Sequence, residues 1–251
     1  LVNPFFPPKA LNDEIRFSLP KLMQSYPSSQ NVQALLAANL FGVSESCIVL
    51  GNGAAELIDQ VTESLKGKFG IYGPTFEEYT ARFQRTDLQV SDQEGFIYDI
   101  NDILRLAARN DGVILINPDN PSGNFIPYED IIRILESMRS EDKYLVIDES
   151  FLDFAENGFE SSVLNQNDLN EFPNLIVIKS IGKSYGVGGL RLGVLASSNV
   201  HLINDIKKSV PIWNINSVAE FYMQIIGKYK SEYRESCDQL IRARRELFQG
   251  L

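Results

Sequence analysis

The sequence predicts an α/β protein with three layers, in which helices cover both faces of a mostly parallel central sheet. Short apolar runs of strand length alternate with longer stretches of helical periodicity, an order typical of βαβ units. The runs at 112–116 and 144–147 are almost wholly apolar, as expected of parallel strands that are buried on both faces. Polar residues and turn formers follow these runs, so we expect a site where the strands end.

Composition sets the broad class. At 251 residues the chain can bury a large core, as one large domain or a domain with an added lobe. Its 44% hydrophobic and 22% charged residues are those of an ordinary globular protein. A net charge of −10 without a basic stretch argues against nucleic acid and anionic membranes as partners. No apolar run approaches the about 20 residues that span a bilayer, and no signal peptide is recognised.

Cysteine and histidine are scarce. Cys47 and Cys237 form no motif, so we expect a reducing, cytoplasmic compartment rather than a disulfide scaffold. His201 is the single histidine, which excludes His-rich metal sites, and a Ser-His-Asp triad could use only that residue. We expect no metal.

The first part of the chain predicts an arm and two helices. Residues 3–8 are proline-rich and extended, and residues 11–24 have helical spacing that Pro20 interrupts. A helix over 31–41 ends at Gly42. Its expected inward face is apolar at helical spacing: Val32, Leu35, Leu36 and Leu40.

A strand at 48–50 leads through Gly51-Asn52-Gly53-Ala54-Ala55 into a helix. The start of such a helix presents free backbone N–H groups to an anion, although the same turn also serves plain strand-to-helix packing. It is not a P-loop, because no Gly-Lys-Ser/Thr follows. A nicotinamide-binding oxidoreductase is disfavoured, since neither glycine cluster reads Gly-x-Gly-x-x-Gly after a strand.

The remaining elements continue the alternation. Further strands are expected at 68–72, 175–178 and 194–196, with short strands or edges at 88–90 and 95–98. Helices are expected at 100–108, 128–138, 200–209, 216–229 and 233–248, and a helix follows Gly73-Pro74-Thr75-Phe76.

Three polar residues follow three apolar strands. Asn120, Asp148 and Lys183 come after the strands at 112–116, 144–147 and 175–178. Asp148 alone could be a helix N-cap or turn residue, but the three placements together predict a ligand site at the carboxyl ends of the strands.

A glycine-rich connection carries Lys183 and, eight residues later, Arg191. Such a lysine can act as an amine nucleophile toward a carbonyl cofactor, and the arginine can bind a phosphate on the same molecule. The alternative is a surface lysine beside a flexible hairpin.

Taken in order, these motifs resemble the fold-type-I, pyridoxal-phosphate-dependent aminotransferases of class I/II. The similarity is greatest to the histidinol-phosphate aminotransferase and threonine-phosphate decarboxylase group. It rests on Asn117-Pro118-Asp119-Asn120-Pro121-Ser122-Gly123, Asp148-Glu149 and the Lys183-to-Arg191 spacing, and runs from about Asn3 to the end. It implies an N-terminal arm at 1–30 that contributes to a small lobe and dimer, and a large cofactor-binding domain at 31–230. Residues 231–251 would begin a small C-terminal domain that is otherwise missing.

The resemblance implies a role for each site residue. Lys183 would be catalytic, holding pyridoxal phosphate as an internal aldimine and moving the substrate proton. Arg191 and Ser180 would hold the cofactor phosphate, together with backbone N–H groups of Gly53, Ala54 and Ala55.

The cofactor ring would be held from three sides. Phe76 would stack on it, Asn120 would donate to its phenolate oxygen, and Asp148 would pair with its pyridinium nitrogen. A carboxylate there keeps the ring nitrogen protonated, so that the ring accepts electrons from a carbanion. Tyr26 would reach the phosphate from the partner subunit, which implies a homodimer. Substrate contacts are expected from Asn3 and Trp213.

The chain also departs from the family pattern. Phe151 stands where a tyrosine usually bonds the phenolate, and Gly182 stands where serine is common. The arginine that normally binds the substrate carboxylate, in the C-terminal lobe, is not identified. We therefore expect an enzyme that moves an amino group between an amino acid or phosphorylated amine and a 2-oxo acid. The alternatives are decarboxylation of a phosphorylated amino acid and a non-catalytic binding module of the same fold.

Overall fold

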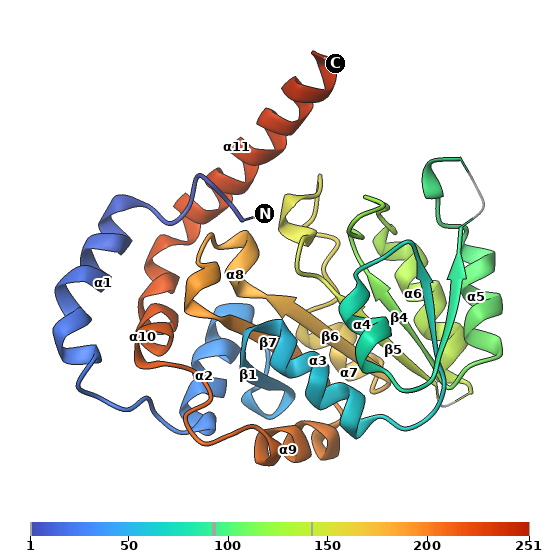
Figure 1. Cartoon of the computed structure of the whole chain (residues 1–251), viewed down its shortest axis with the longest axis horizontal. Coiled ribbons are helices and arrows are strands. Elements are labelled where there is room, and N and C mark those ends of the chain that lie inside the picture. The colour runs from blue at the N-terminus through green and yellow to red at the C-terminus, as the bar shows by residue number, and fades with distance from the viewer. Residues whose placement is uncertain (1, 92–93, 142, 251) are drawn as a thin grey trace.

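The computed structural model describes residues 2–91, 94–141 and 143–250, which form three layers with a sheet in the middle (Figure 1). The described strands make one seven-stranded sheet in the order β1-β7-β6-β5-β4-β2-β3. The predicted three-layer, mostly parallel architecture is confirmed. The strands are β1 (Ile48–Asn52), β2 (Phe69–Gly73), β3 (Thr86–Val90), β4 (Gly112–Ile116), β5 (Tyr144–Asp148), β6 (Leu175–Ser180) and β7 (Leu192–Ala196).

Among these strands, only β7 runs against the others. It pairs antiparallel with both β1 and β6, whereas the remaining pairs are parallel. The amino end of β7 therefore lies at the same edge of the sheet as the carboxyl ends of the other strands. This direction brings Arg191, which directly precedes β7, to the edge where Asp148 and Ser180 end their strands.

Apolar side chains of the strands alternate between two cores. Ile176 and Ile178 belong to the core that contains α3 (Gly53–Ser64), α4 (Glu77–Arg82) and α9 (Val200–Ser209). Leu175 and Val177 face the core on the other side of the sheet. Burial on both faces explains why these strands are continuous apolar runs. The helices of the second side are α2 (Gln30–Phe41), α5 (Ile100–Ala108), α6 (Tyr128–Arg139), α7 (Gln166–Glu171) and α10 (Ser217–Ile225).

Two helices lie at the side of this body. α1 (Lys9–Leu22) packs on α10, and the far end of α11 (Lys230–Gln249) projects away from the rest of the chain (Figure 1). Within the described ranges, none of the helices has both the length and the apolar character that crossing a membrane requires.

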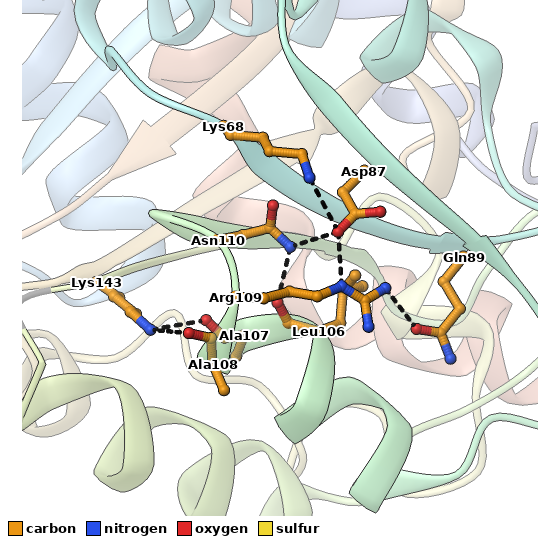
Figure 2. Close-up of polar contacts among 9 residues, drawn as sticks. All are labelled: Lys68, Asp87, Gln89, Leu106, Ala107, Ala108, Arg109, Asn110 and Lys143. Carbon is orange, nitrogen blue, oxygen red and sulfur yellow. Dashed lines mark hydrogen bonds and ion pairs between the residues drawn. The ribbon is translucent and has the colours of Figure 1, made fainter.

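A group of paired charges joins the β3 edge of the sheet to its neighbours (Figure 2). Arg109 Nε donates to Asp87 Oδ2 at 2.7 Å, and Asn110 Nδ2 donates to the same oxygen at 3.0 Å. Lys68 Nζ lies 3.3 Å from that oxygen, and Arg109 also donates to Gln89. These contacts, Arg109 first, hold the pKa of Asp87 well below its usual range. They tie the end of α5 and the start of β2 to the edge strand.

Local expectations were wrong in three places. Pro20 lies inside α1 and does not interrupt it. Glu94–Phe96 is a 3₁₀ turn, where residues 95–98 were expected as a strand. The helix expected over 31–41 is present as α2, but its inward face is not the expected one. Val32 and Leu35 are 44% and 46% exposed. Its buried face consists of smaller residues and one glutamine, which let the helix approach the sheet closely: Gln33, Ala34, Ala37 and Ala38.

Candidate active site

A cavity of about 260 Å³ lies at the carboxyl edge of the sheet. Its volume is close to the lower end of the range for small-molecule sites. Residues from six separate parts of the sequence line it, because β1, β4, β5 and β6 end there and β7 begins there. The predicted residues that line it are Ala54, Ala55, Phe76, Asn120, Asp148, Ser180, Lys183 and Arg191.

One end of the cavity is the start of α3. The first backbone N–H groups of a helix have no partner within the helix and carry a partial positive charge. Gly53 has a φ of +77°, and a Cβ there would lie 2.8 Å from Nη2 of Arg191. A Cβ at Gly193 would lie 2.5 Å from the backbone nitrogen of Ala54. Both glycines are therefore required for β7 and the Arg191 guanidinium to approach the helix start, and the result suits a phosphate group.

The two asparagines in the loop after β4 do different things. Asn117 is buried and exchanges two hydrogen bonds of 2.9 Å with the backbone of Ile126, so it closes the loop. Asp119 accepts hydrogen bonds from Thr75 and Ser122 and holds the loop against the segment before α4. Asn120 lines the cavity. The loop thus presents one amide to a ligand while its other polar groups hold it in shape.

Asp148 is 4% exposed and lies at the end of β5. The backbone N–H of Ser150 donates to its Oδ1, and the hydroxyl of Tyr79 donates to its Oδ2, each at 2.8 Å. Burial raises the pKa of Asp148, while the Ser150 and Tyr79 hydrogen bonds and the charge of Lys183 oppose that rise. A buried carboxylate whose two oxygens are held by donors is suited to accept a hydrogen bond from a protonated ring nitrogen.

Lys183 lies on the short helix α8 (Ile181–Ser184), at the start of the glycine-rich connection that follows β6. Its Nζ lies 4.9 Å from the centre of the Phe151 ring, a cation–π distance. A Cβ at Gly182 would lie 3.1 Å from Cα of Gly188, so glycine at this position lets the two backbone segments pack closely.

Four polar side chains in the cavity have no hydrogen-bond or ion-pair partner among the described residues. The side chains of Asn120, Ser180, Lys183 and Arg191 make no hydrogen bond or ion pair there. Glu78 also lines the cavity, but it is paired with Arg82 on the same helix. Lys183 and Arg191, two cations without an ion-pair partner in the described ranges, lie beside the buried carboxylate of Asp148. This arrangement suits an anionic ligand that also carries a basic group. In the described part of the chain, no group of three or more His, Cys, Asp or Glu is placed to hold a metal ion.

Four of the predicted residues do not line this cavity: Gly53 lies at the start of the helix that does, and Tyr26, Trp213 and Asn3 lie elsewhere. Tyr26 is 77% exposed, and its ring stacks on Trp213 with 4.2 Å between ring centres. Asn3 is 2% exposed; its Nδ2 donates to Ser236 at 2.9 Å, and its N–H donates to the carbonyl of Lys183. Asn3 thereby ties the N-terminal arm to the cavity's lysine through the backbone. Direct contacts of Tyr26, Asn3 and Trp213 with cofactor or substrate stay predictions.

Two contributors were missed from the sequence. Ser150 lines the cavity, and its Oγ accepts the N–H of Ser180 at 2.9 Å, which joins the ends of β5 and β6. Tyr79 on α4 is the second contributor, because its hydroxyl donates to Asp148. Its spacing three residues after Phe76 was the available signal, because that spacing brings both rings to one side of a helical turn.

Residues 7–251 match the family described as "Aminotransferase class I and II". The chain belongs to this family. The family uses pyridoxal phosphate, and a histidinol-phosphate aminotransferase from Sinorhizobium meliloti with the same fold has been solved in complex with it.

Its curated relatives have different activities. CMP-5′-(3-aminopropyl)phosphonate synthase of Streptomyces rubellomurinus is 31% identical over all of this chain and 40% of that protein. L-serine phosphate decarboxylase of Campylobacter jejuni is 31% identical over 92% of this chain and 60% of that protein. Histidinol-phosphate aminotransferase of Clostridium novyi is 31% identical over 97% of this chain and 68% of that protein. The chain thus spans between about two fifths and two thirds of these relatives.

Solved structures agree on the fold. Histidinol-phosphate aminotransferase from Clostridium acetobutylicum matches with a TM-score of 0.82 at 28% identity, over 94% of this chain and 70% of that one. A decarboxylase from Sulfurospirillum multivorans matches with a TM-score of 0.87 at 25% identity, over 99% of this chain and 67% of that one. The chain has the large-domain fold of the fold-type-I pyridoxal-phosphate transferases.

Proposed function

We propose that this chain binds pyridoxal phosphate through Lys183 and belongs to an enzyme that transfers an amino group. Its substrates would be an amino acid or phosphorylated amine and a 2-oxo acid. The observation that carries the proposal is one cavity containing Lys183, Arg191 and the start of α3 around the buried Asp148. Within the described residues, the side chains of Lys183 and Arg191 form no hydrogen bond or ion pair.

The donor set suits this cofactor at three points. The start of α3 with Arg191 supports binding of a phosphate dianion. Asp148 supports binding of a protonated pyridine nitrogen. Lys183, whose amine is free of any ion pair in the described chain, supports covalent attachment to an aldehyde carbon. When bound, pyridoxal phosphate supplies an electron sink for the bonds at the substrate α-carbon.

The residues of the chain divide the remaining work. Asp148 would hold a proton at the ring nitrogen, and Asn120 would donate to the ring oxygen. Phe76, at the mouth of the cavity and 40% exposed, would cover one ring face and exclude water. Lys183 would hold and move the proton that leaves the substrate α-carbon.

Decarboxylation is the second candidate, and the curated relatives support it directly. L-serine phosphate decarboxylase of Campylobacter jejuni is as similar to this chain as the Clostridium novyi aminotransferase, at 31% identity each. The two reactions differ in which bond at the substrate α-carbon is broken. We favour transamination, and propose that the complete enzyme is a homodimer in which Tyr26 reaches the partner's cofactor.

An experiment with two readouts tests both candidates. The protein is loaded with pyridoxal phosphate and incubated with a 2-oxo acid and one candidate substrate at a time. The candidates are histidinol phosphate, O-phosphoserine and O-phosphothreonine. Conversion of the cofactor to its amino form and consumption of the 2-oxo acid would support transamination. Stoichiometric carbon dioxide without a new 2-oxo acid would support decarboxylation instead. Failure to bind pyridoxal phosphate would contradict both.

A further inference from the structure

Tyr79 is a buried polar group that the proposed chemistry does not use. It lies on α4, three residues after Phe76, and is 0% exposed. Its hydroxyl donates to Asp148 Oδ2 at 2.8 Å. Its ring also belongs to the hydrophobic core on that face of the sheet, so packing alone could explain the ring but not the placement of the hydroxyl.

The two oxygens of Asp148 are held by donors from different elements. Ser150, just after β5, donates to Oδ1, and Tyr79 on α4 donates to Oδ2. An ionised carboxylate accepts about four hydrogen bonds, so each oxygen keeps a lone pair free. The carboxylate can therefore receive a ligand N–H while both oxygens remain fixed.

We propose that Tyr79 is a positioning residue that fixes the Asp148 carboxylate and keeps it ionised toward the ring nitrogen of the cofactor. This inference rests on the proposed function, because it assigns Tyr79 to the same cofactor. α4 would then serve the site twice: Phe76 covers the ring and Tyr79 supports the carboxylate that binds its nitrogen.

The hydroxyl has the protonation state that this role needs. Burial and then the charge of Asp148 raise the pKa of Tyr79 far above 10, so it remains a donor. The other titratable group that acts on Asp148 is Lys183, whose positive charge also favours the ionised carboxylate. Removing the hydroxyl makes the buried carboxylate a stronger base. A proton shared between the carboxylate and the ring nitrogen would then lie further toward Asp148.

Tyr79→Phe tests the inference, because it removes one oxygen and keeps the ring. The matched control is Tyr128→Phe on α6, whose hydroxyl donates to Asp168 at 2.9 Å on the other face of the sheet. Both variants are titrated with pyridoxal phosphate, and the visible band of the cofactor bound to Lys183 is followed against pH.

We expect Tyr79→Phe to raise the dissociation constant of pyridoxal phosphate about tenfold, as for one hydrogen bond to a buried charge. The pH midpoint of the band should rise by about one unit, because a less protonated ring withdraws fewer electrons from the imine nitrogen. Tyr128→Phe should change neither value.

Repeating the substitution in an Asp148→Asn background separates positioning from packing. If Tyr79 acts through Asp148, Tyr79→Phe changes affinity less than twofold there, because the two single effects are not additive. An unchanged pH midpoint in Tyr79→Phe, or an undiminished affinity loss in the Asp148→Asn background, would overturn the inference and leave the proposed function standing. If the unsubstituted protein formed no visible band, the proposed function would fail and the inference with it.

Discussion

Lys179 and Lys183 are four residues apart and lie in opposite surroundings. The Lys179 side chain is 5% exposed, and its Nζ lies 2.8 Å from Asp153 Oδ1 on the α10 side of the sheet. Lys183 is only partly buried and, within the described residues, forms no ion pair. Burial by itself would lower the pKa of Lys179, but the charges of Asp153 and Glu149 outweigh that and raise it. The Lys179 charge is neutralised by carboxylates of the fold. The Lys183 amine has no ion-pair partner in the described chain and lies in a cavity, where it is available to a ligand.

The same contrast holds for the adjacent carboxylates Asp148 and Glu149. Asp148 faces the cavity, whereas Glu149 faces the cluster of Lys179 and Asp153. Glu149 accepts hydrogen bonds from Ser162 Oγ at 2.5 Å and from the backbone of Val163 at 2.8 Å. Alternation along β5 and β6 thus places the candidate ligand site on one face and a buried cluster of paired charges, which lines a second cavity of about 250 Å³, on the other.

The largest effect on stability should come from Lys179→Met. The substitution leaves Asp153 buried without a counter-charge, which costs about 3–5 kcal/mol of unfolding free energy. Urea unfolding measures this loss. Adding Asp153→Asn should recover part of it, because only one of the two buried acidic groups that face Lys179, namely Glu149, then remains. A loss below about 1 kcal/mol would mean that the ion pair behaves as a solvated surface pair and not as a buried one.

Glu149→Gln should change the pH dependence of stability. Burial raises the pKa of Glu149 to about 7. The folded protein therefore binds a proton that the unfolded chain releases, and the free energy of unfolding falls as pH rises from about 4.5 to 7. The total fall is on the order of 3 kcal/mol. In Glu149→Gln, urea unfolding at several pH values should show a flatter profile over this window; an unchanged slope would contradict the assignment.

Phe151→Tyr sharpens the comparison at the site. A hydroxyl at this position would donate to the ring oxygen of the cofactor, as the usual family tyrosine does. That favours the deprotonated imine, so the pH midpoint of the visible band should fall by about one unit. Phe154→Tyr is the matched control, because Phe154 lies nearby but does not line the cavity. Equal shifts in both variants would show that the effect does not come from the cavity.

Asp87→Asn should have the smallest effect. Asp87 is partly exposed and held by Arg109, Asn110 and Lys68 (Figure 2), so its loss costs about 1 kcal/mol, reduced further by salt. Its lowered pKa means that this contribution is present above about pH 4 and disappears as pH falls below that value. Acid unfolding of the variant beside the unsubstituted protein measures it, with cofactor binding expected unchanged. A loss as large as that of Lys179→Met would contradict the distinction between exposed and buried pairs.

The strands and the site edge could be predicted because both depend on local signals. Apolar runs such as 112–116 read as buried strands, and parallel strands bring Asn120, Asp148 and Lys183 to one edge without further information. The buried face of α2 could not be predicted. Hydrophobicity favoured Val32 and Leu35, but close approach to the sheet favours the alanines.

Contacts between distant segments were also beyond sequence reasoning. The hydrogen bond from Tyr79 to Asp148 joins residues 69 positions apart, and the one from Asn3 to Ser236 joins residues 233 positions apart. The direction of β7, which brings Arg191 to the site, depends on pairing with β1 and β6 rather than on its own apolar residues.

Borohydride trapping tests the central claim most directly. The protein is incubated with pyridoxal phosphate, reduced, digested and mapped by mass spectrometry, beside Lys183→Ala. The account predicts one stable cofactor adduct on Lys183, none on Lys179 four residues earlier, and loss of the adduct in the variant. An adduct on other lysines with Lys183 unmodified, or an equal adduct in Lys183→Ala, would contradict it.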